Sequence, residues 1–212
     1  MFTTTRGIEF QIESPEFEGY ENDAQVRYIT DYVQAVEDAI YGENFCTEDG
    51  QSYRDLMDIS STIDYWWMQE LSMNGDGYIS GSTYLYKPRN EKLYWGPLWD
   101  FDYVAWGSYD YSEEPNVSYF AHADSIWFSR LLQDRSYAQM VLAHWNQVRD
   151  VLMEACRKGG ALDRYADQIR ISMRYDMERW GGYLFGQESL LSFDQEVERL
   201  RAWIIRRTQW ID

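Results

Sequence analysis

Apolar residues at helical spacing are the feature of this sequence that most constrains its fold. From residue 125 to the C-terminus they recur every three or four positions, which places them on one face of an α-helix. Glycine pairs at 159–160 and 181–182 interrupt the pattern and are typical of helix ends. The pattern therefore predicts four helices, over residues 125–132, 137–152, 162–180 and 193–211.

The first half of the sequence predicts two more helices and one hairpin. Apolar residues at helical spacing mark 23–40, which ends before a glycine, and 60–74. Aromatic and aliphatic residues at 84–86 and 93–95 flank a turn that contains Pro88, and this pattern is typical of a β-hairpin. The expected fold class is α+β, mostly helical, with a small β-hairpin.

The composition fits one globular domain and argues against several classes of partner. With 212 residues, 45% of them apolar, the chain can form a core, and we expect a single domain over residues 1–212. The 36 acidic and 19 basic residues give a net charge of −17. Because nucleic acids and anionic membrane surfaces are bound through cationic side chains, this charge argues against both. No stretch has the roughly 18 apolar residues that a membrane span needs.

The N-terminus and the cysteines give little information about location. The first residues lack the basic start and apolar run of a secretory signal peptide. Cys46 and Cys156 lie far apart and outside the spacings of zinc ligands. They are either free thiols or a pair, and the sequence leaves both alternatives open.

Three aspartates between residues 64 and 107 are the candidate functional residues. Asp76 lies in a glycine-rich loop after the second helix, and Asp100 and Asp102 follow the second strand of the hairpin. If that strand continues, side chains at i and i+2 point the same way, and the two carboxylates share one face. Carboxylates that gather in this way repel one another unless a cation lies between them. The pattern therefore predicts a site for a divalent metal.

A simpler interpretation needs no metal. Asp76 would cap a turn, and Asp100 and Asp102 would lie at a solvated end of the strand. The neighbouring Trp99 and Phe101 argue against it, because bulky aromatic side chains predict partly desolvated charges, which are costly to keep without a function.

A third interpretation is a calcium loop of the EF-hand type. Residues 72–80 match such a loop at several positions, including the glycine at its sharp turn. The loop lacks the strong carboxylate ligands, because Ser72 stands at its first position and Thr83 at its twelfth. A strand is also expected where the second EF-hand helix would begin.

Several short motifs, in this order, resemble the spore-coat-protein-H (CotH) kinase family. They are Asp64-Tyr65, Glu70-Leu71, Asn74-x-Asp76, Tyr84-x-Tyr86, Gly96-Pro97, Trp99-Asp100-Phe101-Asp102, the segment from Trp127 to Leu132, and Arg207-x-x-Trp210. The resemblance implies an atypical protein-kinase-like fold, with this chain as its C-terminal lobe. It also implies ATP with Mg²⁺ or Mn²⁺ as cofactors and transfer of a phosphoryl group to a hydroxyl of a protein substrate.

The resemblance implies a role for each candidate aspartate. Asp76 matches the catalytic aspartate of the family and Asp100 its metal-binding aspartate, with Asp102 as a second candidate metal ligand. Phosphoryl transfer is consistent with this set, because it needs one carboxylate to hold the metal on the phosphates and another to orient the acceptor hydroxyl. The resemblance further implies a bacterial spore coat, cell surface or secreted location.

Two departures from the family pattern limit these expectations. Many members have an asparagine as second metal ligand where this chain has Ser82 and Thr83. The lysine that holds the nucleotide phosphates belongs to an N-terminal lobe, and none of Lys87, Lys92 and Lys158 is placed like it. We therefore expect the chain to correspond to the C-terminal portion of the family domain and to be inactive by itself. The alternative function is a non-catalytic surface or assembly module that keeps the fold and binds at most a metal.

Overall fold

The computed structural model describes most of the chain, and its contacts divide it into two compact units. The described residues are 1–16, 23–77, 82–102, 104–107, 116–180, 183–184, 187–188 and 191–212. Unit 1 comprises Met1–Glu70, Gly75–Asp100 and Ala121–Val141, and unit 2 comprises Leu71–Asn74, Phe101–Phe120 and Leu142–Asp212. The single domain expected from the sequence stays a prediction.

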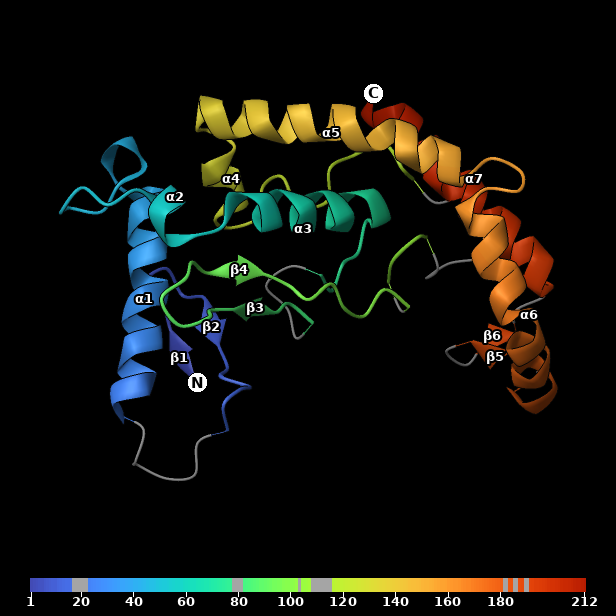
Figure 1. The fold of residues 1–212 in the computed structure, drawn as a ribbon, viewed down its shortest axis with the longest axis horizontal. Coiled ribbons are helices and arrows are strands. Elements are labelled where there is room, and N and C mark those ends of the chain that lie inside the picture. The colour runs from blue at the N-terminus through green and yellow to red at the C-terminus, as the bar shows by residue number, and fades with distance from the viewer. Residues whose placement is uncertain are drawn as a thin grey trace. The chain divides into compact units, whose positions relative to one another are not determined.

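The described part of the chain is mostly helical, as the periodicity predicts (Figure 1). Its helices are α1 (Asp23–Tyr41), α2 (Tyr53–Leu56), α3 (Ile59–Ser72), α4 (Phe128–Leu131), α5 (Arg135–Ala155), α6 (Ala161–Trp180) and α7 (Phe193–Ile211). Its strands form antiparallel pairs, β1 (Phe2–Thr3) with β2 (Glu9–Phe10), β3 (Leu85–Tyr86) with β4 (Tyr94–Trp95), and β5 (Tyr183–Leu184) with β6 (Gln187–Glu188). The α+β fold class is confirmed. The longer predicted helices begin and end within a few residues of their expected positions.

In unit 1 the β3–β4 hairpin packs against α3 (Figure 1). Leu85 pairs with Trp95 across the hairpin, and the backbone N–H of Trp95 donates to Oγ of Ser61 on α3 at 3.2 Å. The rings of Trp95 and Tyr65 lie 5.0 Å apart. The hairpin is therefore confirmed at the predicted residues, with strands shorter than expected.

Aromatic side chains of α3 form the centre of the core of unit 1. Trp66 and Trp67 contact each other edge to face, with their ring centroids 4.7 Å apart, and both are buried. The indole N–H of Trp67 donates to the carbonyl of Val141 on α5 at 2.9 Å, so its polar atom is satisfied inside the core. The ring of Phe128 on α4 lies next to the ring of Trp66, with the ring centroids 6.4 Å apart. Both tryptophans are therefore core residues of unit 1.

A fully buried carboxylate attaches the N-terminal segment of unit 1 to α1. Glu37 of α1 has no exposed surface. Its oxygens accept hydrogen bonds from the hydroxyls of Thr4 at 2.9 Å and Thr5 at 3.3 Å, from the backbone N–H of Arg6 at 3.1 Å, and from Nε1 of Trp127 at 3.0 Å. A buried charge is tolerated only with such partners, so Glu37 fixes the β1–β2 turn and the chain entering α4 to the same helix.

A second carboxylate joins α2 to the start of α5. Oδ2 of Asp134 accepts from Arg54 Nη2 and from the hydroxyl of Tyr53, both at 2.8 Å, and its Oδ1 accepts from the backbone N–H of Ser136 at 2.9 Å. Burial alone would raise the pKa of Asp134, but the hydrogen bonds from Arg54, Tyr53 and Ser136 outweigh it and lower the pKa below its usual range. The ionised form of Asp134 therefore stabilises this junction.

In unit 2, α7 is fixed at its N-terminus and along its buried face. The hydroxyl of Ser192 accepts from the backbone N–H of Gln195 at 3.3 Å, and the Gln195 side chain accepts in return from the N–H of Ser192, which forms a capping box. Nε1 of the buried Trp203 donates to the carbonyl of Leu71 at 3.3 Å. These contacts set the position of α7 within unit 2.

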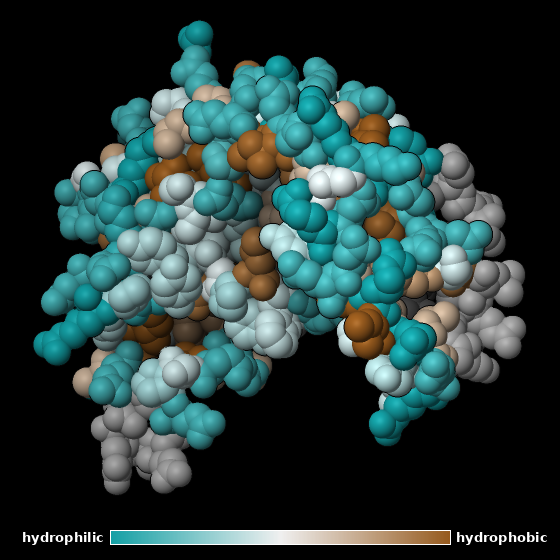
Figure 2. All heavy atoms as spheres, turned by 45° about the vertical axis from the view of Figure 1, so that its right-hand side comes forward, coloured by the Kyte–Doolittle hydropathy of each residue, from teal (hydrophilic) through white to brown (hydrophobic). Residues whose placement is uncertain are grey.

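Figure 2 shows hydrophilic residues over most of the face that it presents. Cys46 and Cys156 are free thiols, which decides between the two alternatives that the sequence leaves open. Within the described ranges, no helix combines the length and the apolar content that crossing a membrane requires.

The core position of Trp67 gives a first prediction. Trp67→Ala should lower the free energy of unfolding by about 3–5 kcal/mol, because it leaves a cavity and removes the hydrogen bond to the Val141 carbonyl. Trp180→Ala is the matched control, because Trp180 is 60% exposed and its loss should cost little. Chemical denaturation measures both, and equal costs would contradict the assignment of Trp67 to the core.

The Asp134 junction gives a second prediction. At neutral pH, Asp134→Asn should lower the free energy of unfolding by about 1–3 kcal/mol, because it removes charged hydrogen bonds. A carboxyl whose pKa is lowered on folding stabilises the protein above its unfolded pKa of about 3.9, and that contribution disappears as the pH falls through the folded value. The difference in the free energy of unfolding between the parent and Asp134→Asn should therefore shrink below about pH 4.

The matched control for this experiment is Asp150→Asn. The Asp150 side chain is 87% exposed and its contact with Arg149 is long, at 3.7 Å. Its variant should stay within about 0.5 kcal/mol of the parent at each pH. If the free energies of unfolding of the parent and of Asp134→Asn differ by the same amount down to acid pH, the carboxylate charge is not what stabilises the junction.

Candidate functional site

Two side chains of α3 fix the loop that carries Asp76. The hydroxyl of Tyr65 donates to the carbonyl of Gly77 at 2.5 Å, and burial raises the pKa of Tyr65, so this group stays a protonated donor. A Cβ atom on the buried Gly77 would lie 1.8 Å from Oε1 of Gln69, so any other residue there would require the Gln69 side chain to move. Asp76 itself is half-buried. The loop thus holds this carboxylate in a defined position within unit 1.

Asp100 does not lie on a strand, which corrects the prediction from the sequence. β4 ends at Trp95, and the chain from there to Asp102 forms no strand. Gly96 has a φ of 132°, and Pro97 has no N–H to offer a neighbouring strand, so the ladder cannot continue. Asp100 has a φ of 63°, in the left-handed region. The argument that Asp100 and Asp102 share one face of a strand is therefore wrong.

The expected desolvation of these aspartates is also wrong. Asp100 and Asp102 are exposed, and the neighbouring Trp99 is 57% exposed, so the aromatic residues beside them do not cover them. Asp76 and Asp100 belong to unit 1, whereas Asp102 belongs to unit 2. The structure therefore brings two of the three candidate residues into one unit. The roles of all three stay predictions.

A residue that the sequence analysis did not count among the candidates contacts Asp100 directly. The hydroxyl of Ser82 donates to Oδ2 of Asp100 at 2.7 Å. Two residues later, the ring of Tyr84 contacts Trp99 edge to face at 6.4 Å. The segment that follows the Asp76 loop therefore lies beside the segment that carries Asp100. The signal in the sequence is that Ser82 and Thr83 stand where many members of the family have a metal-binding asparagine.

These residues suit a magnesium ion better than a cation that needs many protein ligands. Within the part of the chain that the structure describes, no three His, Cys, Asp or Glu side chains gather closely enough to hold a metal. The Asp100 carboxylate and the Ser82 hydroxyl offer oxygen ligands, and Mg²⁺ is often bound by one or two carboxylates, with waters and substrate phosphates completing its shell. The donor set therefore fits Mg²⁺ or Mn²⁺ on a phosphate-bearing ligand.

The EF-hand alternative receives no support. Residues 78–80 of that loop lie outside the described residues. The strand β3 begins at Leu85, where an EF-hand would continue as a helix. The described geometry thus argues against a calcium loop.

Other motif residues hold loops rather than form a site. Both oxygens of the fully buried Glu70 accept backbone hydrogen bonds, from Ala121 N–H at 2.8 Å and from His122 N–H at 2.6 Å. In unit 2 the fully buried Arg207 donates from Nη1 to the carbonyls of Val117 at 2.5 Å and Tyr119 at 2.6 Å. These buried charges are satisfied by the backbone, so their role is structural.

The close approach of Gly77 to α3 generates a third prediction. Gly77→Ala should cost about 1–3 kcal/mol of unfolding free energy, because the added Cβ collides with the Gln69 side chain. In a Gln69→Ala background the same substitution should cost clearly less, since the colliding atoms are gone. A double-mutant cycle measures this coupling. Equal costs in both backgrounds would show that the contact does not constrain the loop.

Comparison with known proteins identifies the family. Neither the curated proteins nor the solved structures give a match. The family model described as CotH kinase protein matches residues 2–211, nearly the whole chain. The match spans the Asp76 loop, the hairpin, the Asp100 segment and the closing α7 helix, which confirms the resemblance drawn from the sequence motifs. The chain thus belongs to the CotH kinase protein family.

Proposed function

We propose that this chain carries the phosphoryl-transfer centre of a CotH-type protein kinase, in a kinase-like C-terminal lobe. Asp76 would orient the acceptor hydroxyl of a protein substrate and accept its proton. Asp100 would hold Mg²⁺ or Mn²⁺ on the phosphates of ATP. The observation that carries the proposal is the 2.7 Å hydrogen bond from Ser82 to Asp100.

That hydrogen bond supports the proposal because of where its two residues stand in the chain. In protein kinases the catalytic-loop aspartate precedes the metal-binding aspartate in the chain. An asparagine a few residues after the catalytic aspartate binds metal together with the metal-binding aspartate. Here Ser82 follows Asp76 closely in sequence and its hydroxyl reaches Asp100. A hydroxyl can ligate Mg²⁺, although it is a weaker ligand than the amide oxygen of the asparagine it replaces.

The backbone at Asp100 supports the same assignment. Non-glycine residues rarely adopt a positive φ, and residues held there tend to cluster at functional sites. Asp100 adopts a φ of 63° and is exposed, so its conformation does not serve to bury the side chain. An exposed carboxylate in this backbone conformation is consistent with the proposed role of Asp100 as a metal ligand.

The charge of the chain favours nucleotide binding through a metal. ATP is an anion, and it would approach a protein of net charge −17. A bound Mg²⁺ supplies neutralising charge at the phosphates. The residues of the chain then orient the reacting groups, with Asp76 on the acceptor hydroxyl and Ser82 on the Asp100 carboxylate.

A thermal-shift titration tests the metal site as the fourth prediction. Mg²⁺ or Mn²⁺ should raise the melting temperature of the parent, because ligands that bind only the folded state stabilise it by mass action. Asp100→Ala should abolish this shift, and Ser82→Ala should weaken it. Ser82→Asn, which restores the ligand of other family members, should keep or strengthen it.

The control for the titration is Asp31→Ala, which removes an exposed carboxylate of α1 far along the chain from the candidate site. It should respond to metal as the parent does. The same titration with ATP, with and without the metal, should show nucleotide binding only when the metal is present. A metal response that persists in Asp100→Ala would contradict the site. No response in any variant would favour the alternative of a non-catalytic module.

A further inference from the structure

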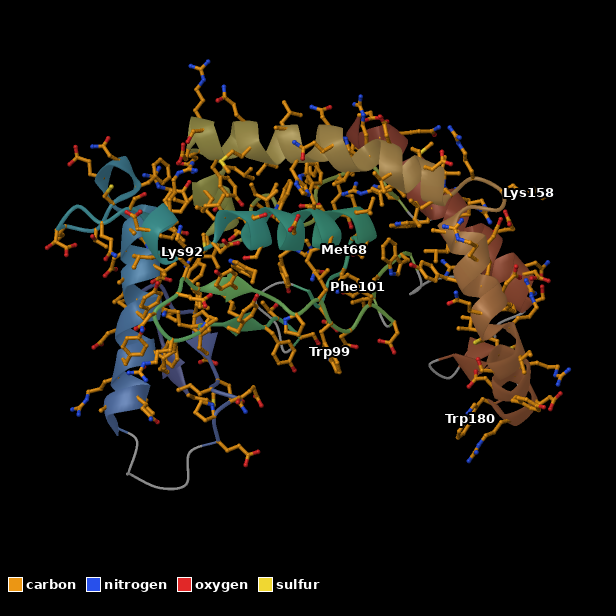
Figure 3. All side chains as sticks on the ribbon, in the orientation of Figure 1. Met68, Lys92, Trp99, Phe101, Lys158 and Trp180 are labelled. Carbon is orange, nitrogen blue, oxygen red and sulfur yellow. The ribbon has the colours of Figure 1, made fainter. Side chains whose placement is uncertain are left out.

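A pocket with tyrosines and charged side chains in its wall lies in unit 1, where the turn of the β3–β4 hairpin faces α1 and α2. Its volume is about 560 Å³, within the range of about 300–1,000 Å³ that is usual for ligand sites. Five of its lining side chains come from α1 and the hairpin, and they are Tyr28, Tyr32, Lys87, Lys92 and Tyr94. Figure 3 labels Lys92 close to α2, where its Nζ donates to the carbonyl of Arg54 at 2.7 Å. None of these residues belongs to the proposed phosphoryl-transfer centre.

The tyrosine rings of the pocket are held in place and remain accessible. The hydroxyl of Tyr32 donates to the carbonyl of Leu56 at 2.8 Å, and the rings of Tyr32 and Tyr28 lie 6.1 Å apart. On the hairpin, Tyr94 stacks on Tyr86, with ring centroids 5.1 Å apart and an interplanar angle of 11°. Tyr28 is 53% exposed. Rings that are already ordered lose little conformational entropy when a ligand covers them.

The charges of the pocket argue against an ionic ligand. Its charged side chains are of both signs, Lys87 and Lys92 together with Asp55, Asp58 and Glu91. The Lys87 ammonium already lies over the Tyr32 ring, with Nζ 4.4 Å from the ring centroid, so another cation would compete with it. An anion would meet three carboxylates, in a protein of net charge −17. The pocket therefore favours a neutral polar ligand.

The charged groups also keep hydrogen-bonding capacity for such a ligand. An ammonium has three N–H donors, and among the described residues Lys87 uses one on the carbonyl of Pro88 at 3.0 Å and Lys92 one on Arg54. Oδ1 of Asp58 accepts from the backbone N–H of Ser61 at 2.7 Å, and a carboxylate can accept several more bonds. A ligand hydroxyl both donates and accepts, so it can pair with groups of both kinds.

We propose that this pocket binds a neutral oligosaccharide, with one sugar ring stacked on Tyr28 and its hydroxyls hydrogen-bonded to Lys92 and the carboxylates. A sugar ring has C–H groups on its faces and hydroxyls at its edge, which matches the aromatic and polar groups of the pocket. The C–H groups carry a small positive charge and are attracted to the electron-rich face of an aromatic ring. The proposal is independent of the phosphoryl-transfer centre, because the two share no residue.

Isothermal titration calorimetry with the full chain tests this proposal. The probes are maltohexaose, cellohexaose and the hexamer of N-acetylglucosamine, three neutral chains that differ in linkage and substituents. At least one of them should bind the parent with a dissociation constant of about 1 mM or tighter. Inorganic phosphate and spermidine are titrated in parallel as an anion and a cation, in enough salt to screen non-specific attraction to the acidic surface.

Four variants define the expected pattern. Tyr28→Ala should weaken sugar binding at least about ten-fold, the factor expected for loss of an aromatic anchor, and Tyr28→Phe should keep most of the affinity because the ring remains. Lys92→Met keeps the aliphatic chain and loses the donors, so it should weaken binding a few-fold. Tyr165→Ala is the matched control, because Tyr165 on α6 is 66% exposed and lies outside the pocket. Circular dichroism checks that each variant is folded.

The outcomes decide between a sugar site and its alternatives. No binding of any of the three hexasaccharides, an affinity that Tyr28→Ala leaves unchanged, or an equal loss in Tyr28→Phe and Tyr28→Ala would each overturn the proposal. Binding of phosphate or spermidine that disappears in Tyr28→Ala, without binding of a sugar, would show that the pocket takes an ion and would overturn it as well.

Discussion

The burial of α3 is the physical constraint on which the candidate site depends. Trp66 and Trp67 bury one part of the helix surface in the core of unit 1. Once they are fixed, Tyr65 and Gln69 on the same helix have defined positions, and the Gly77 backbone packs against them. The position of the Asp76 loop therefore follows from hydrophobic burial several residues earlier in the chain. A rigid helix that supports a reactive loop is the usual way in which a fold positions functional groups.

The charged residues of the chain divide by environment into structural and candidate functional groups. Glu37, Glu70 and Arg207 have no exposed surface, and each holds a loop by hydrogen bonds to its backbone or side chains. Removing such partners would leave an unpaired buried charge, so these residues are important for stability whatever the chain does. Asp100 differs, because it is exposed and has a positive φ. Residues held at positive φ tend to cluster at functional sites, so Asp100 stays a candidate functional residue.

Local patterns in the sequence predicted the elements, whereas the site needed information that a pattern does not carry. Helical spacing and glycine stops located the long helices, and the apolar runs around Pro88 located the hairpin. The extension of β4 through Asp100 failed because alternation alone ignores the break at Gly96-Pro97. The partners of Glu37 lie up to 90 residues away in sequence, so no local signal could reveal its role. The bond between Ser82 and Asp100, 18 residues apart, is hidden for the same reason.

The distribution of charge along the chain bears on how a phosphate ligand could reach the candidate site. Residues 142–212 contain 11 basic and 11 acidic residues, so the whole net charge of −17 lies in residues 1–141, which include Asp76, Asp100 and Asp102. A field of one sign concentrates cations and repels anions near the surface. If the chain binds metal and nucleotide as proposed, this field would enrich divalent metal near these carboxylates, and a nucleotide that already carries metal would meet less repulsion than a free one. Because salt screens such a field, the metal requirement should be strongest at low ionic strength.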